Sequence, residues 1–550
     1  MLLNASTWRV RLVACLSICL TTLLASASAE ELPEPLAKIE LADGDTLVFL
    51  GDSITHQCLY TQYVEDFFFT RYPQANIRFH NAGVGGAKAW DALQRFDRDV
   101  ANFKPKYVTV LLGMNDGRYQ PFNQEVFDTY KTDMTEVVEQ IKETGAKPVL
   151  MTPTMFDARA RLLRDPKASG GAMEEYNAVL AYYGQWLQRQ AMKNGYGFVD
   201  MHGPLNNLTI EARKTDPNFT MIADAVHPGP NGQLVMAFAI INDMGLRKPL
   251  SSIRVSQGPK GKPVSRVSGG KLTDLRIEDD GLSFTWTADA LPWVLPEEAQ
   301  EGAKMLHLGH KASREALEVH DLPAGSYQLT IDDQVVGVYS AQQLARHIEL
   351  QENPKTPQYQ QAMQVAELNK QRNAGPIRSM RGEWSRFQQY ARVKQQVADA
   401  PNEANQKQLE TLTKQTEGMD ERVAKLNEEI EQLAAEIREV AQPKPHKYRL
   451  EKVEAAKVSG LVTLNGEPLA GAAVRFVPTG AAGSIARGRT NNAGNFVAVS
   501  GGLPGVLPGE YQVVIEKDGF VPAKFANEKS SPLRCNVVVG KNDLQFELQK

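Results

Sequence analysis

The sequence predicts an α/β fold for residues 30–250, with a three-layer α/β/α domain on a parallel sheet, and a different architecture beyond it. Three observations support this prediction. Short apolar runs end at a glycine or an aspartate, and segments with helical spacing separate them. Strands that are apolar throughout belong to sheets covered on both faces. From about residue 251, short β-like runs and a long polar helix replace this alternation.

Four apolar runs are predicted as strands of the parallel sheet, and two segments are predicted as helices that cover it. The strands are expected at 46–50, 107–112, 147–151 and 197–200, and the helices at 127–144 and 173–194. In open parallel sheets, functional residues gather at the carboxyl ends of the strands. We therefore expect the site of this domain where these runs end.

Composition and turns divide the rest of the chain into three regions: a small β domain at 251–340, a helical region at 341–442, and a β-sandwich at 457–550. Within the helical region, apolar residues recur every three or four positions and predict a heptad helix over 405–441. This helix has two interpretations. It packs back on its own chain, or it forms a homodimer through a coiled coil.

The N-terminus has the pattern of a signal peptide over residues 1–29. Arg9 and Arg11 precede the apolar run 12–25, and small residues lead to Glu30. The run is shorter than the ~20 residues that span a bilayer, so the mature chain is expected without stable membrane insertion. Cys15 ends a lipoprotein-like box, but Arg11 lies too close for an apolar stretch before it. We expect an exported protein that is periplasmic, secreted or on the cell surface.

The composition bears on nucleic-acid partners and on whether the cysteines form a disulfide. The net charge of −4 over 550 residues, without a basic run, argues against a nucleic-acid partner. Of four cysteines, Cys58 and Cys535 remain after signal removal. Two distant cysteines make no disulfide framework, so two buried free thiols are favoured over a Cys58–Cys535 bridge.

The strongest local motif is the run Gly51-Asp52-Ser53-Ile54-Thr55, between a strand and a helical segment. A serine there lies beside the amides that open a helix, and these amides attract an oxyanion. The alternative is an ordinary helix start, in which Ser53 is only a cap.

A second motif, Asp224-Ala225-Val226-His227, offers a histidine base and a carboxylate to orient it. By itself it is an ordinary surface turn. Two further segments supply hydrogen-bond donors: the glycine-rich run 81–86, and Asn115 directly after a strand. Backbone N–H groups and amide side chains of this kind form oxyanion holes.

The four motifs in this order resemble the SGNH (GDSL-type) hydrolase family over residues 45–245, with leucine of the name motif replaced by Ile54. The resemblance implies a flavodoxin-like fold. It also implies that Ser53 is the nucleophile, with Asp224 and His227 as its partners. The Ser53 N–H, the Gly86 N–H and the Asn115 side chain would form the oxyanion hole. No cofactor or metal is implied.

The last ~95 residues resemble a carboxypeptidase-regulatory-like (transthyretin-like) sandwich, through the segments 458–476, 490–496 and 508–511. Such modules imply no chemistry of their own. The whole chain is therefore expected to be an exported serine esterase acting on carboxylic esters, with acetylated polysaccharide as the preferred substrate. The alternatives are a lipase, lysophospholipase or thioesterase, and a non-catalytic cell-surface scaffold.

Overall fold

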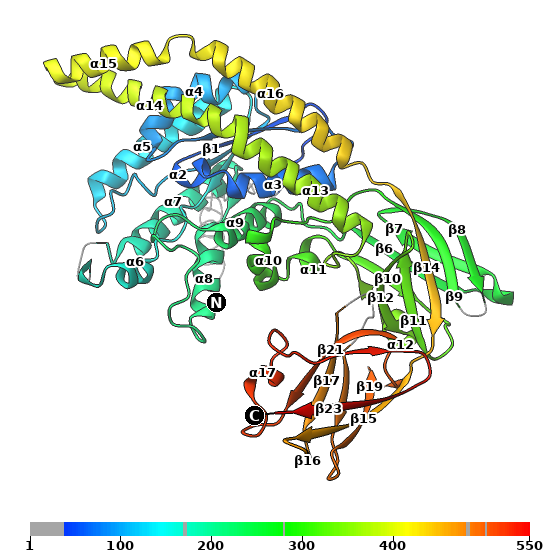
Figure 1. The fold of residues 1–550 in the computed structure, drawn as a ribbon. Helices are drawn as coiled ribbons and strands as arrows, with labels where there is room; N and C mark the ends of the chain where they lie inside the picture. The colour runs from blue at the N-terminus through cyan, green and yellow to red at the C-terminus, as the bar shows by residue number, and fades with distance from the viewer. Residues whose placement is uncertain (1–37, 169–172, 279–280, 480–484, 501–502, 550) are drawn as a thin grey trace, which may run out of the picture.

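The computed structural model describes residues 38–168, 173–278, 281–479, 485–500 and 503–549 (Figure 1). The expected signal peptide, with Cys15, lies outside these ranges. No helix within them is both long and apolar enough to cross a membrane.

A five-stranded parallel sheet forms the N-terminal domain, as the sequence predicts. In spatial order its strands are β2 (Arg78–Gly83), β1 (Thr46–Gly51), β3 (Tyr107–Leu111), β4 (Lys147–Met151) and β5 (Gly197–Val199). Every residue of β1 is buried, which explains its continuously apolar sequence. Strand β2 was not predicted, because its polar residues His80 and Asn81 and its final glycine suggest a loop.

Helices flank this sheet. They are α2 (Ser53–His56), α3 (Leu59–Arg71), α4 (Ala89–Asp99), α5 (Gln124–Glu143), α6 (Ala158–Arg164), α7 (Tyr176–Asn194), α8 (His202–Ala212) and α9 (Pro230–Asp243). Helix α3 packs on α9, and α4 packs on α5. The three consecutive phenylalanines at 67–69 on α3 are all buried in the core.

The small β domain consists of two sheets around a common core. One sheet has the order β13 (Ile348–Glu349), β10 (Glu315–Val319), β6 (Ser251–Gln257) and β7 (Pro263–Ser268). The other has the order β12 (Gln334–Ser340), β11 (Ser326–Ile331), β14 (Pro445–Val453), β9 (Gly281–Ala288) and β8 (Gly270–Glu278).

This domain differs from the predicted range 251–340 in three ways. Strand β13, at 348–349, lies beyond that range. Strand β14, which follows the helical region, is the central strand of the second sheet. The segment 289–312 leaves the β domain, and its helices α10 (Gln300–Leu306) and α11 (Leu308–Ala312) pack on the N-terminal core. Trp293 shows the attachment, since its indole N–H donates to the Tyr63 carbonyl at 2.9 Å.

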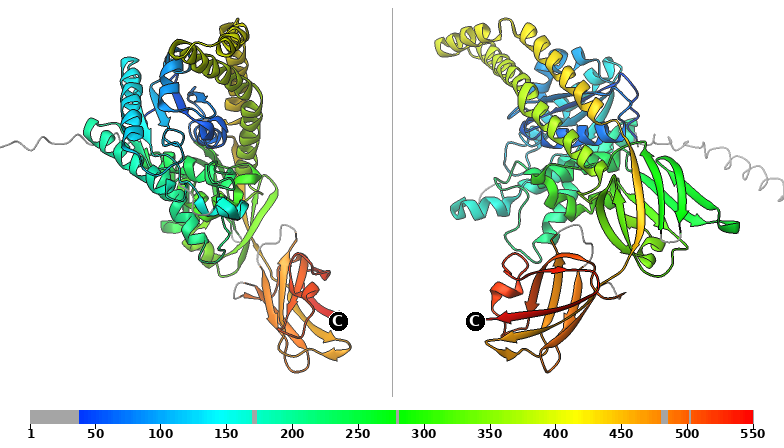
Figure 2. Two further views of the ribbon diagram at one scale, coloured as in Figure 1. Left: turned by 90° about the vertical axis from the view of Figure 1, so that its left-hand side faces the viewer. Right: turned by 45° about the vertical axis from the view of Figure 1, so that its right-hand side comes forward.

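The helical region contains α12 (Ala341–Arg346), α13 (Pro357–Arg372), α14 (Arg378–Asp399), α15 (Glu403–Thr416) and α16 (Met419–Val440). The predicted single helix 405–441 is wrong, because the chain breaks at Glu417–Gly418. Gly418 has φ +64°, a conformation that ends helices, so α15 and α16 are separate. Helix α15 packs on α14, and the two project from the domain (Figures 1 and 2).

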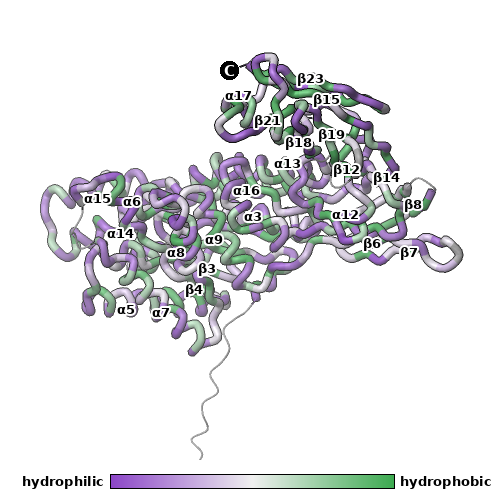
Figure 3. Tube along the Cα trace, turned by 90° about the horizontal axis from the view of Figure 1, so that it is seen from below, coloured by the Kyte–Doolittle hydropathy of each residue, from purple (hydrophilic) through white to green (hydrophobic). Residues whose placement is uncertain are grey.

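Most apolar positions of the predicted heptad helix that lie on α16 contact the protein's own core. Met419, Ile430 and Ile437 are buried in the same hydrophobic cluster as the parallel sheet. This is the intramolecular interpretation of the apolar pattern. Helix α15 is mainly hydrophilic along its length (Figure 3).

The C-terminal region has a core of its own, which includes Phe476, Phe496, Tyr511 and Phe546. Its elements are β15 (Lys457–Leu464), β16 (Glu467–Pro468), β17 (Ala473–Pro478), β18 (Ala486–Arg489), β19 (Asn495–Ser500), β20 (Leu503–Pro504), β21 (Gly509–Glu516), α17 (Ala523–Ala526), β22 (Arg534–Val537) and β23 (Lys541–Leu548).

The two cysteines expected in the mature chain are both free. Cys58 is buried, and burial raises the pKa of its thiol to about 12. Cys535 is only partly buried, so the expectation of two buried thiols is right for Cys58 alone.

Candidate active site

Ser53 lies where β1 ends and the short helix α2 begins. The buried Asp52 caps α2, since its carboxylate accepts the Ile54 N–H at 2.9 Å. The turn is tight: a Cβ on Gly51 would lie 2.1 Å from Thr55 Oγ1, so only glycine fits there. Asp52, and not Ser53, is therefore the cap, and the Ser53 side chain, partly exposed, is left for other partners.

The Ser53 hydroxyl is hydrogen-bonded to His227, although 174 positions separate the two residues. Ser53 Oγ and His227 Nε2 are 2.8 Å apart, and His227 Nδ1 and Asp224 Oδ2 are 2.7 Å apart. Asp224 Oδ1 also accepts the N–H of Val226 at 2.9 Å and that of His227 at 2.7 Å. The fold thus brings the three predicted residues into one continuous hydrogen-bond relay.

The pKa of Asp224 determines which atoms of this relay donate hydrogen bonds and which accept them. Burial would raise its pKa, but the backbone and ring of His227 and the N–H of Val226 outweigh burial and hold that pKa below its usual value. An ionised carboxylate only accepts hydrogen bonds, so His227 Nδ1 is the donor to Asp224. His227 Nε2 is then free to accept the proton of Ser53.

The loop that carries Asp224 and His227 is held at both ends. Ala225 has φ +77°, a strained value for a residue with a Cβ, and its carbonyl accepts the Asp157 N–H at 2.9 Å. The Gly229 N–H donates to the Met221 carbonyl at 2.8 Å, directly before α9 begins at Pro230. These bonds fix the direction in which His227 faces Ser53.

The glycine-rich run forms a β-turn at the end of β2. The Ala87 N–H donates to the Val84 carbonyl at 3.2 Å, with Gly85 and Gly86 at the two central positions. Gly86 has φ +66°, as the third residue of a type II turn requires. The Val84 N–H donates to the Gly51 carbonyl at 3.1 Å, so the turn lies beside the end of β1. Within the described ranges, no hydrogen bond engages the Gly86 N–H.

Asn115 follows β3 and joins the same group of residues. Its side-chain N–H donates to the Ala87 carbonyl at 3.1 Å, and its Oδ1 accepts the Tyr119 hydroxyl at 3.1 Å. An amide side chain has two N–H groups, and the second is left for another acceptor. Tyr119 was missed by the sequence reasoning, because it lies in no strand, helix or motif.

Two buried carboxyl groups support this arrangement. Burial, followed by the nearby charge of Asp116, raises the pKa of Asp52 to about 7. Burial also raises the pKa of Asp116 to about 7, while its Oδ1 accepts the Ala89 N–H that opens α4. Both groups are structural: each fixes the start of a helix next to the proposed oxyanion site.

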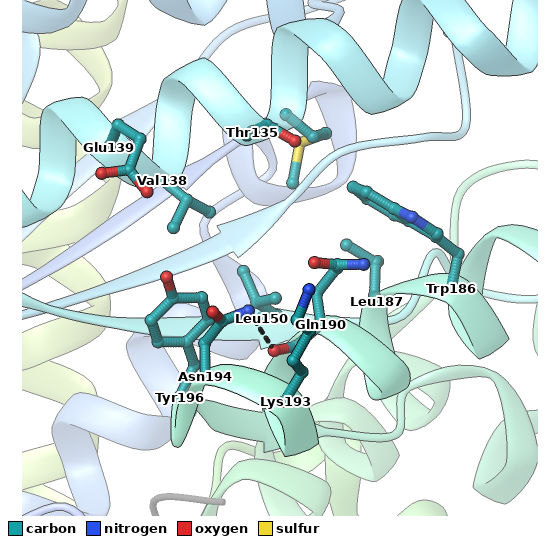
Figure 4. Close-up of a pocket in the computed structure, with 11 residues that line it drawn as sticks. Thr135, Val138, Glu139, Leu150, Trp186, Leu187, Gln190, Lys193, Asn194 and Tyr196 are labelled. Atoms are coloured by element: carbon teal, nitrogen blue, oxygen red, sulfur yellow. Dashed lines mark hydrogen bonds between the residues drawn. The ribbon is translucent and has the colours of Figure 1, made fainter. Parts of the chain in front are cut away.

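In the described residues, no group of three or more His, Cys, Asp or Glu side chains is arranged to hold a metal ion. A pocket of about 120 Å³ lies between α5 and α7, with Val138, Leu150 and Trp186 among its lining residues (Figure 4). None of the predicted site residues lines it, so it is separate from the relay.

Comparisons with known proteins identify the family of this domain. Residues 49–235 match the model of the GDSL-like lipase/acylhydrolase family. An acetylxylan esterase of Geobacillus stearothermophilus is 26% identical over 229 residues, which are 38% of this chain and 97% of that protein. Its solved structure has a TM-score of 0.31.

A second structure matches more of the chain. A gut microbial diltiazem-metabolizing enzyme has a TM-score of 0.64 and 25% identity, covering 76% of this chain and all of that one. An uncharacterized lipoprotein of Bacillus subtilis is 33% identical over 85 residues, 14% of this chain and 33% of its own length. The predicted family and the predicted esterase class are thereby confirmed.

Proposed function

Residues 49–235 belong to the GDSL-like lipase/acylhydrolase family and the chain is an ester hydrolase, and on that premise we propose that it removes O-acetyl groups from carbohydrate through an acyl-enzyme on Ser53. The observation that carries the proposal is the relay from Ser53 Oγ through His227 to Asp224, with separations of 2.8 and 2.7 Å. A serine hydroxyl needs such a base to become a nucleophile at neutral pH.

The first half of the reaction forms the acyl-enzyme. His227 Nε2 takes the proton of Ser53 as Oγ bonds to the ester carbonyl carbon, and the carbonyl oxygen becomes an oxyanion. Asp224 stabilises the imidazolium that results. The tetrahedral intermediate then collapses, and its bond to the alcohol oxygen breaks. His227 returns its proton to that oxygen, so the alcohol leaves neutral.

The second half releases the acid. Water enters, His227 removes its proton, and the water oxygen bonds to the acyl carbon. Collapse breaks the bond to Ser53 Oγ, which regains a proton from His227. Both tetrahedral intermediates carry a negative oxygen. We assign its donors as the Ser53 N–H, the Gly86 N–H and the second side-chain N–H of Asn115.

The similarity to an acetylxylan esterase, over nearly the whole of that protein, supports an acetylated carbohydrate as the substrate. An exported location is consistent with a polysaccharide substrate. Export itself is proposed from the charged, apolar and small-residue segments of residues 9–29, together with the partial similarity to a lipoprotein.

The test is hydrolysis by the purified mature chain of aryl acetates, longer aryl esters and acetylated xylo-oligosaccharides. Ser53→Ala should abolish turnover, because no other group holds the acyl chain. It should leave the melting temperature unchanged. Ser459→Ala, on strand β15 of the separate C-terminal region, is the matched control. Turnover by folded Ser53→Ala would refute the mechanism. A preference for long acyl chains would support lipase or thioesterase activity, and not deacetylation, as the function.

A further inference from the structure

Helix α14 contacts the β-turn at residues 84–87, more than 300 positions earlier in the chain. Gln388 Nε2 donates to the Gly85 carbonyl at 3.1 Å, and Arg392 Nη2 donates to the Gly86 carbonyl at 2.8 Å. The two donors lie four residues apart, on one face of α14, which packs on α4 (Figure 1). The two central residues of the turn are therefore held from outside the hydrolase domain.

The bond from Gln388 engages the peptide group on which the proposed oxyanion hole depends. The Gly85 carbonyl and the Gly86 N–H belong to one peptide unit, which is the central peptide of the turn. Type I and type II turns differ mainly in the direction of this unit, and two glycines allow both directions. A donor fixed on the carbonyl holds the N–H pointing the opposite way.

Arg392 secures the rest of the same segment. Its guanidinium forms two bonds with Asp91, at 2.6 and 2.7 Å, and Asp91 accepts the Lys88 N–H at 2.8 Å. The pair is well shielded on one side, since the Asp91 side chain is only 2% exposed. Arg392 thus links the turn, the start of α4 and α14.

We propose that Gln388 and Arg392 are positioning residues for the oxyanion hole, so that the helical region controls catalysis by the hydrolase domain. This inference rests on the proposed function, in which the Gly86 N–H is a donor. Gln388 holds that N–H toward the substrate and Arg392 holds the turn that presents it. Neither residue touches the reacting atoms.

The environment of Gln388 separates this role from a purely structural one. Gln388 is 3% exposed, and within the described part of the chain its Oε1 has no hydrogen-bond partner. Burying an unpaired carbonyl oxygen is unfavourable, so an apolar side chain of similar length should fold at least as well. Gln388→Met therefore removes the donor with little change in stability expected.

The experiment compares Gln388→Met with Gln395→Met. Gln395 is exposed on the same helix and its side-chain N–H donates to Asp399, so it receives an identical substitution away from the turn. For Gln388→Met, kcat on an aryl acetate should fall roughly 10-fold, less than the roughly 10²- to 10³-fold loss expected for a deleted donor. KM should change less than about twofold, because the oxyanion exists only after attack.

A boronic acid that forms a tetrahedral adduct on Ser53 supplies the second readout. Its affinity should fall by about the same factor as kcat, whereas Gln395→Met should match wild type in both. Arg392→Lys keeps the charge opposite Asp91 but loses the paired geometry, and it should lie between the two.

The outcomes distinguish this inference from the function on which it rests. A stable Gln388→Met variant with wild-type kcat and boronate affinity overturns the positioning role while Ser53-dependent turnover stands. A lower melting temperature with unchanged kinetics also overturns it, since the contact would then be structural only. Turnover by Ser53→Ala would instead refute the proposed mechanism itself.

Discussion

At the scale of single residues, Ser53 and Asn115 each keep a hydrogen-bonding group that is not needed to hold the local fold. Ser53 is not needed as a helix cap, because Asp52 fills that position. Asn115 uses one N–H on the Ala87 carbonyl and retains a second. Hydrogen-bond capacity that the fold leaves unused is what a reacting group requires.

Asn115→Ala should lower kcat by roughly 10²- to 10³-fold, about 3–4 kcal/mol of transition-state stabilisation, with KM nearly unchanged. Asn123→Ala is the control, since Asn123 caps α5 by accepting the Val126 N–H at 3.0 Å. Losing that cap should cost about 1 kcal/mol of stability and no activity. Steady-state kinetics with thermal melting decide the case: an Asn115→Ala variant that is less stable but fully active would exclude Asn115 from the oxyanion hole.

At the scale of elements, strand β2 is enclosed by aromatic groups from distant parts of the chain. The His80 ring stacks on Phe103 with centroids 3.4 Å apart, and Trp384 of α14 lies edge-on at 5.8 Å. This burial lowers the pKa of His80 to about 3. The contact between Trp384 of α14 and His80 is therefore made with a neutral imidazole near neutral pH.

We expect acid to destabilise the protein through His80. Above pH ~6.5 the imidazole is neutral in both folded and unfolded states, so it contributes no pH dependence there. As pH falls from 6.5 toward the folded-state pKa of about 3, the unfolded state binds the proton first and stability is lost. The loss is at most about 1.4 kcal/mol per pH unit, or ~2 kcal/mol by pH 5.

Denaturant unfolding between pH 5 and 8 measures this effect. The difference in unfolding free energy between wild type and His80→Asn should change in that range by about the stated amount, regardless of its absolute value. The same substitution at the exposed His307 is the control. A difference for His80→Asn that does not change with pH would contradict the expectation.

At the scale of the whole molecule, the chain returns to complete a domain that it began much earlier. The helices α13 to α16 lie between β12 and β14, and β14 then inserts between β11 and β9. Tyr448 and Leu450 of β14 are 3% and 1% exposed in the core of that β domain. The helical region is thus anchored at both ends to the same β domain, while the C-terminal β region has its own core.

Two truncations test this organisation. A chain ending at Glu454 keeps β14 and should retain wild-type esterase activity, because only the separate C-terminal core is lost. A chain ending at Gln442 loses β14, and the absence of Tyr448 and Leu450 alone should cost about 4 kcal/mol or more. Melting temperature and activity of both chains are the readouts. Equal stability of the two truncated chains would show that β14 is dispensable.

The sequence by itself determined the parallel α/β domain and the identity of the relay residues. Continuous apolar strands and motifs such as Gly51-Asp52-Ser53 are local, so they can be recognised without neighbours from elsewhere. Ser53, Asp224 and His227 were identified through the resemblance of the four motifs taken together, because Ser53 alone could be a helix cap and the Asp224–His227 segment alone an ordinary surface turn. Their hydrogen bonds, at 2.8 and 2.7 Å, are what the structure added.

Only the tertiary structure shows which residues in the second half of the chain contact and support the domain formed by the first half. Nothing local marks β14 as a central strand, or distinguishes Gln388 and Arg392 from other polar residues of an amphipathic helix. The heptad-like pattern of 405–441 was equally ambiguous, since a helix needs an apolar face for its own core as much as for a partner. These features depend on contacts between distant residues, some more than 300 positions apart, and such contacts impose no spacing on the sequence.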